Sequence, residues 1–180
     1  MTAEDSHEER TFSPQAIHLV RTVTQTNLAL SQMADQKASL LMGAAFVVFT
    51  LAVGQASRGS VSPTLMVLGL FAFLAACLAV AAVLPSVSPK PVADNQPNIL
   101  FFGVFTGMDE EDFADRVIDR LGSDEDIFRV MLRDIYQNGQ VLYRKKYRLL
   151  GWSYRMFIAG LTLSLASFVF EQRAALMAFG

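Results

Sequence analysis

A run of basic and aromatic side chains, YRKKYR at Tyr143–Arg148, is the densest group of residues that could do chemistry in this 180-residue chain. Lysine and arginine bind phosphate, and tyrosine rings stack on nucleobases. The run therefore predicts a phosphate-binding rim, with Tyr136, Tyr143 or Tyr147 available for stacking. The alternative is that it anchors a membrane-spanning helix, because each basic residue near an anionic lipid surface contributes about 1 kcal/mol of attraction. The sequence leaves both interpretations open.

The second concentration of charge is a set of ten acidic residues between Asp109 and Asp134. Their spacing lacks the calcium loop of an EF-hand, and helix capping accounts for them. The single cysteine, Cys77, lies within an apolar run, and the two histidines, His7 and His18, are both near the N-terminus. These residues are too few for a metal centre or for Ser/His/Asp or Cys/His catalysis. There is also no Walker A motif and no GxGxxG. We therefore expect no enzyme, no metal and no resident cofactor.

The composition indicates a membrane protein, since 52% of the residues are hydrophobic and 18% are charged, against about 25% charge in an ordinary soluble domain. The apolar residues form three blocks long enough to cross a bilayer core of about 30 Å, without the alternation of barrel strands. We predict transmembrane helices at 38–57, 64–84 and 150–171. Three buried helices of a soluble bundle are the alternative. The net charge of −2 argues against a nucleic-acid binder.

The topology follows from the lysines and arginines. Arg58 is the one basic residue between spans one and two, and Arg173 is the one after span three. Of the other 13 basic residues, 12 precede span one or lie between spans two and three, and Arg155 lies near the start of span three. The positive-inside rule then places the N-terminus and the middle region in the cytoplasm, with an external tail at 172–180.

The N-terminal segment is expected to have two parts. Residues 1–13 form an acidic leader that we expect to be disordered. Residues 14–37 form an amphipathic cytoplasmic helix, with Ser13 as its N-cap, that continues without a break into span one. Asp35 and Lys37 then lie at the membrane surface, where Lys37 is either an interface anchor or a phosphate ligand.

The middle region, 86–148, is expected to be cytoplasmic and mostly helical. After a Pro-rich exit and a short apolar run that is β-prone or irregular, a helix over 108–121 is capped by Asp109. Ser123 starts a further helix that can run on into span three and loosen at Gly139 or Gly151. The predicted fold class is an all-α membrane protein with three transmembrane helices and a cytoplasmic helical region between spans two and three.

The order of four short motifs resembles a known family. The motifs are ADQKAS at Ala34–Ser39, NILFFG at Asn98–Gly103, DIYQ at Asp134–Gln137 and KKYRLL at Lys145–Leu150. Over about residues 15–170 this order is similar to the transmembrane effectors of bacterial Pycsar anti-phage systems, the PycTM-type proteins. The resemblance implies a multi-pass inner-membrane effector, encoded beside a uridylate or cytidylate cyclase. Cyclic UMP or cyclic CMP would activate it, and it would then impair the membrane and halt the infected cell.

Charge and location select the candidate ligand residues. We expect polar or phosphate contacts from Lys37, Asn98, Arg133, Lys145, Lys146 and Arg148, and base stacking from Tyr136 or Phe102.

Three spans enclose too little space for a pore, so permeation requires a homo-oligomer. The expected partners are the lipid bilayer, the cyclic nucleotide and further copies of the chain. The alternative function is a membrane-anchored scaffold or assembly subunit that binds a protein partner through its cytoplasmic helices.

Overall fold

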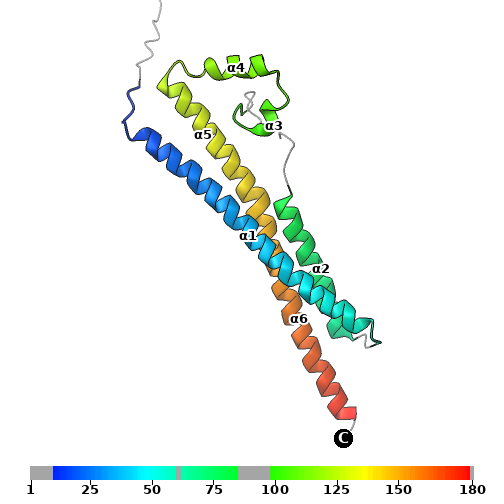
Figure 1. Cartoon of the computed structure of the whole chain (residues 1–180). Helices are drawn as coiled ribbons and strands as arrows, with labels where there is room; N and C mark the ends of the chain where they lie inside the picture. The colour runs from blue at the N-terminus through cyan, green and yellow to red at the C-terminus, as the bar shows by residue number, and fades with distance from the viewer. Residues whose placement is uncertain (1–9, 60–61, 85–97, 179–180) are drawn as a thin grey trace, which may run out of the picture. The chain divides into compact units, whose positions relative to one another are not determined.

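The computed structural model describes residues 10–59, 62–84 and 98–178, and every element within these ranges is a helix (Figure 1). The predictions for most of the acidic leader, for the Pro-rich exit after span two and for the last two residues lie outside the described residues. The all-α fold class is confirmed. The chain forms two compact units, which we call unit 1 (Met1–Leu28 and Ser86–Gly139) and unit 2 (Ala29–Pro85 and Gln140–Gly180).

Three helices are long and apolar enough to cross a membrane, as the sequence predicts. The first is α1 (Ala16–Ala56) and the second is α2 (Pro63–Val83). The third is the end of a helical run that extends from Asp124 to Met177 and includes α6 (Arg148–Ala178). Each contains at least the roughly 20 residues that a helix needs to cross a bilayer core.

The start of α1 agrees with the predicted cap. The Ser13 hydroxyl accepts a hydrogen bond from the Gln15 amide, and the Ser13 carbonyl accepts one from Ala16. No glycine or proline interrupts the segment between Ala16 and the apolar block. The helix is therefore continuous over the amphipathic segment and the first predicted span.

Small residues pack the apolar helices of unit 2, where α2 lies along α6 (Figure 1). The buried residues of α2 recur at helical spacing on one face: Gly69, Ala72, Ala75, Ala79 and Ala82. The buried hydroxyl of Ser153 on α6 donates to the carbonyl of Ala75. At Gly160 an added Cβ would collide with the Cβ of Phe71. Close approach of backbones supplies the packing contacts that hold helices together in lipid.

Unit 1 contains three helices after residue 98: α3 (Phe102–Phe105), α4 (Glu110–Ile118) and α5 (Asp124–Val141). The two predicted caps are confirmed, because Asp109 accepts from the Glu111 amide and Ser123 accepts from the Asp126 amide. The apolar run that was expected to be β-prone or irregular is instead a turn followed by the single-turn α3. The Asn98 side chain accepts from the Leu100 amide, which bends the chain at this point.

The break in helix regularity lies at a π-helical segment, η1 (Leu142–Tyr147), between α5 and α6. The prediction of loosening at Gly139 or Gly151 is therefore wrong, since both glycines lie within regular α-helix. A glycine costs a helix only about 1 kcal/mol, which a continuous helix absorbs. Single π turns are rare in proteins as a whole, and those that occur frequently lie at functional sites.

Candidate functional site

The side chain of Lys146, on η1, is bound within unit 2. Its ammonium group donates to both carboxylate oxygens of Asp35, at 2.8 and 2.7 Å, and to the hydroxyl of Ser31 at 2.8 Å. The Lys146 side chain is 22% exposed and that of Asp35 is 44% exposed. An ammonium group has three donors, and these three acceptors can use them all. A phosphate reaching Lys146 would therefore have to displace Asp35 or Ser31.

The residues on either side of Lys146 also bind neighbouring helices of unit 2. The ammonium group of Lys145 donates to the carbonyl of Leu84, the C-cap of α2, at 2.6 Å. The hydroxyl of Tyr147 donates to the carbonyl of Leu30 on α1 at 3.2 Å. Three successive residues of η1 thus hold α1 and the end of α2. We call these contacts of Lys145, Lys146 and Tyr147 the η1 contacts.

The remaining candidate residues of unit 2 are exposed. Arg148 begins α6 with an exposed side chain, and Lys37 is exposed on α1. The Lys37 carbonyl accepts a long hydrogen bond, 3.5 Å, from the Tyr154 hydroxyl. Lys37 and Arg148 are therefore accessible to an anion, whereas Lys145 and Lys146 are committed to contacts within the protein.

Four candidate residues lie in unit 1, and Asn98 is the buried one, with 4% exposure. Its amide donates to the Asp134 carboxylate at 2.8 Å, and its carbonyl oxygen accepts from the Leu100 amide at 3.0 Å. Because both ends of the side chain are used, Asn98 holds the turn before α3 against α5. A role in positioning fits this geometry better than a direct ligand contact.

The other three candidates of unit 1 are more accessible. The side chains of Phe102 and Tyr136 are 49% and 64% exposed. Arg133 is half-buried and lies three residues before Tyr136 on α5, so the two are neighbours on the helix surface. A guanidinium group next to an exposed phenol ring can bind a phosphate while the ring stacks on a base.

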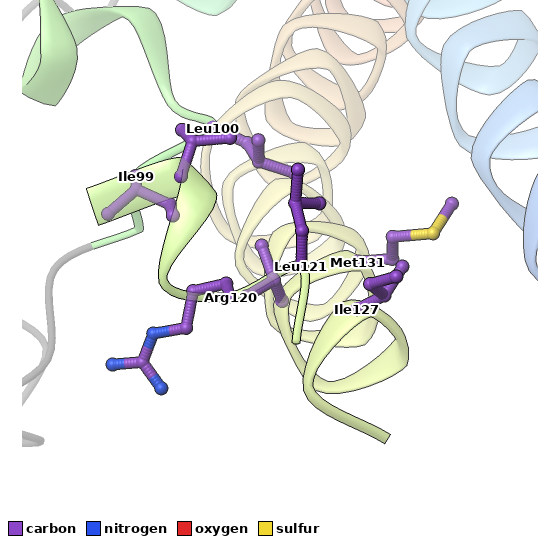
Figure 2. A pocket seen from close by; sticks show the side chains of 8 residues that line it. Ile99, Leu100, Arg120, Leu121, Ile127 and Met131 are labelled. Carbon is purple, nitrogen blue, oxygen red and sulfur yellow. The ribbon is translucent and has the colours of Figure 1, made fainter. Parts of the chain in front are cut away.

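A small apolar pocket of about 140 Å³ lies between the turn before α3 and helices α4 and α5 (Figure 2). Seven of its eight lining side chains are apolar, and the guanidinium group of the eighth, Arg120, points away from the others in Figure 2. A nucleotide needs hydrogen-bond donors for its phosphate. The pocket is therefore a gap in the apolar packing of unit 1 and a poor fit for a nucleotide.

The predicted site did not include Asp35, which binds Lys146, or Asp134, which binds Asn98. Sequence reasoning placed Asp35 only at the membrane surface and treated Asp134 as one of an acidic set. A signal for Asp35 was present, since it is the only acidic residue between Arg10 and Asp94. A carboxylate so isolated beside an apolar block predicts a basic partner elsewhere in the chain.

Comparison with known proteins gives one match. The model of the Pycsar effector protein domain, PycTM, matches residues 18–171. No curated protein and no solved structure matches the chain. The matched range includes all of α2 and η1, nearly all of α1, α6 as far as Glu171 and the candidate residues of both units.

Proposed function

Since the chain belongs to the PycTM family of Pycsar effector proteins and is thus a membrane effector of anti-phage defence, we propose that cyclic UMP or cyclic CMP activates it and that the activated protein impairs the inner membrane. In this proposal the protein acts as a homo-oligomer and catalyses no reaction. Its N-terminus is cytoplasmic and its C-terminus lies outside, as the distribution of basic residues favours.

The η1 contacts are the observation that carries the proposal. A ligand shifts a conformational equilibrium only by binding one state better than the other. The η1 contacts are polar and partly exposed, and they hold helices that pack mostly through small apolar residues. Loss of these few polar contacts would free the end of α2 and the start of the apolar part of α1. Such a change would allow the helices of several copies to rearrange.

Arg133 and Tyr136 are the favoured residues for the nucleotide in unit 1. They lie on α5, which continues through η1 into α6 as one helical run. A ligand that binds α5 can therefore act on η1 through the helix itself. In this proposal Arg133 binds the cyclic phosphate and Tyr136 stacks on the pyrimidine.

Leakage of a dye from liposomes that hold the full chain tests this function. We expect cyclic UMP or cyclic CMP, but not linear UMP, to release the dye. Tyr136→Ala and Arg133→Gln should each raise the nucleotide concentration for half-maximal leakage at least about fivefold, since base stacking contributes about 1–3 kcal/mol and a charge-assisted phosphate bond a similar amount. Asn138→Ala changes an exposed side chain on the same helix, α5, and should leave that concentration unchanged.

Absence of leakage with both cyclic nucleotides, in liposomes where the protein is folded, would overturn the proposal. A specific protein partner that co-purifies with such an inert chain would then support the scaffold function.

The same leakage assay with a cyclic purine nucleotide shows whether the pyrimidine is required. Equal release by cyclic AMP would contradict pyrimidine recognition by Tyr136.

A further inference from the structure

The basic run around η1 divides into two sets with different surroundings. Lys145 and Lys146 make the η1 contacts, whereas Arg144 and Arg148 are exposed. Trp152, which is 48% exposed, lies four residues after Arg148, and the exposed Arg155 lies three residues after Trp152. Residues three and four apart are neighbours on a helix surface. We call the exposed set of Arg144, Arg148, Trp152 and Arg155 the arginine face.

The arginine face has no counter-charge from the described protein. Unit 2 contains eight basic residues and two acidic ones. Both acidic side chains are engaged elsewhere: Asp35 binds Lys146, and Glu171 accepts from the Thr64 amide at 3.0 Å. Within residues 10–59, 62–84 and 98–178, no carboxylate pairs with a guanidinium group of the arginine face. Three positive charges beside an apolar helix thus lack an acidic partner among the described residues.

The position of Arg155 predicts the level of the bilayer surface on this face. It falls within the apolar block that begins near residue 150, and a charge in the hydrocarbon region is costly, by about 3 kcal/mol at the centre of a span. Its guanidinium carbon lies 5.2 Å from the ring centroid of Trp152. Trp152 is nearly one turn closer to the start of α6, so the Arg155 side chain extends in that direction. Arginine that extends toward the headgroups, beside a tryptophan, is typical of a membrane interface.

We propose that the arginine face binds the phosphate groups of anionic phospholipids. A guanidinium group binds phosphate oxygens through paired hydrogen bonds, which an ammonium group does not match. Further along the same face Ile158 is 58% exposed. An acyl chain can therefore lie against the helix below a headgroup held by the arginines. This apolar continuation favours a lipid over a soluble phosphate, and the inference does not depend on activation by a nucleotide.

Trp152 provides a direct measurement, because it is the only tryptophan of the chain. The full chain is reconstituted, without nucleotide, in vesicles of phosphatidylcholine and phosphatidylglycerol at a fixed ratio. Bromine, which quenches tryptophan fluorescence on contact, is placed on the chains of one lipid or the other. We expect brominated phosphatidylglycerol to quench Trp152 with an apparent preference of about fivefold over brominated phosphatidylcholine, and high salt to reduce this preference.

Three sets of variants separate the proposal from a general effect of charge. The triple variant Arg144→Gln, Arg148→Gln and Arg155→Gln should lower the preference to about one, while Lys at the same three positions should retain part of it. The matched control, Arg58→Gln with Arg173→Gln, removes two exposed basic residues elsewhere in unit 2. That control should keep the full preference. Circular dichroism checks that each variant remains helical.

Two outcomes would overturn the proposal. One is equal quenching of the unmodified chain by the two brominated lipids. The other is loss of the preference on addition of inorganic phosphate but not of sodium chloride at the same ionic strength, because the arginine face would then bind a soluble phosphate. Neither outcome affects the leakage test of the proposed function, which measures the response to cyclic nucleotides.

Discussion

The two units of this chain are stabilised in different ways. Unit 1 carries 15 acidic and 7 basic residues, whereas unit 2 carries 2 acidic and 8 basic residues. Among the described residues of unit 1 only Val20 and Asn98 are buried, while unit 2 contains the buried alanines of α1 and α2. Unit 1 therefore relies on caps, amide hydrogen bonds and half-buried side chains. Unit 2 relies on close packing of small residues and on a few polar contacts at η1.

This difference indicates which part of the molecule can respond to a ligand. Regions with few buried contacts open at lower free energy than tightly packed ones. Changes in unit 1 should accordingly have local effects, while a steric change between α2 and α6 should affect the whole of unit 2. Four substitutions, each with a matched control, test this contrast.

Gly160→Ala should have the largest effect. The new Cβ would collide with the Cβ of Phe71, an atom close to the backbone that cannot move aside. We expect a loss of about 2 kcal/mol in the free energy of unfolding in detergent micelles. Gly151→Ala, on the same helix with open space around the added Cβ, should be neutral or slightly stabilising. Equal stability of the two variants would show that α2 and α6 are not closely packed there.

Asn98→Ala should destabilise unit 1 by about 1.5 kcal/mol, because it removes the bonds to Asp134 and to the Leu100 amide from a buried position. Hydrogen exchange followed by mass spectrometry should show faster exchange in α3 to α5 and no change in α2. Asn138→Ala, which is exposed, serves as the control. Faster exchange spread equally over α2 would contradict the division into two units.

Lys146→Met should cost about 1 kcal/mol, since it leaves Asp35 without its basic partner, and the exposure of both side chains limits the loss. Hydrogen exchange should rise in α1 around Ser31 and Asp35. Lys37→Met removes an exposed lysine from the same helix and should leave exchange unchanged. If Lys146→Met lowers the free energy of unfolding no more than Lys37→Met does, the η1 contacts do not stabilise unit 2.

Ser123→Ala should have the smallest effect, about 0.5–1 kcal/mol confined to the start of α5, because the hydroxyl accepts from the Asp126 amide. Exchange of the first amides of α5 reports the change. The control is Ser39→Ala, which should cost close to nothing because the Ser39 hydroxyl, among the described residues, bonds to the Asp35 carbonyl one turn earlier in the same helix. A larger effect at Ser39 would mean that this serine takes part in packing that the chain alone does not show.

Much of the fold was predictable because its causes are local. Apolar blocks of membrane length predicted the three long helices, and the caps at Asp109 and Ser123 follow from side chains that bond to amides two or three residues away. Short motifs in a fixed order predicted the family. The turn at Asn98 was also local, but the sequence predicted only a run that is β-prone or irregular and did not indicate the single-turn α3 after it.

The candidate site was less predictable because its partners are distant in sequence. Lys146 and Asp35 are 111 residues apart, and Asn98 and Asp134 are 36 residues apart. No periodicity or capping rule connects such pairs. In the sequence YRKKYR is one basic cluster. In the structure its lysines are bound to neighbouring helices, whereas its arginines are exposed.

The sequence by itself determined that the chain is helical, that three helices can cross a membrane and that it belongs to the PycTM family. Hydropathy, capping and motif order depend only on residues that are near one another in the chain. The tertiary structure alone decided where η1 lies, which of its lysines bind neighbouring helices and which arginines have no acidic partner among the described residues. The physical reason is that an ion pair forms between side chains that packing brings together, and packing of α1, α2 and α6 joins residues that the sequence holds far apart.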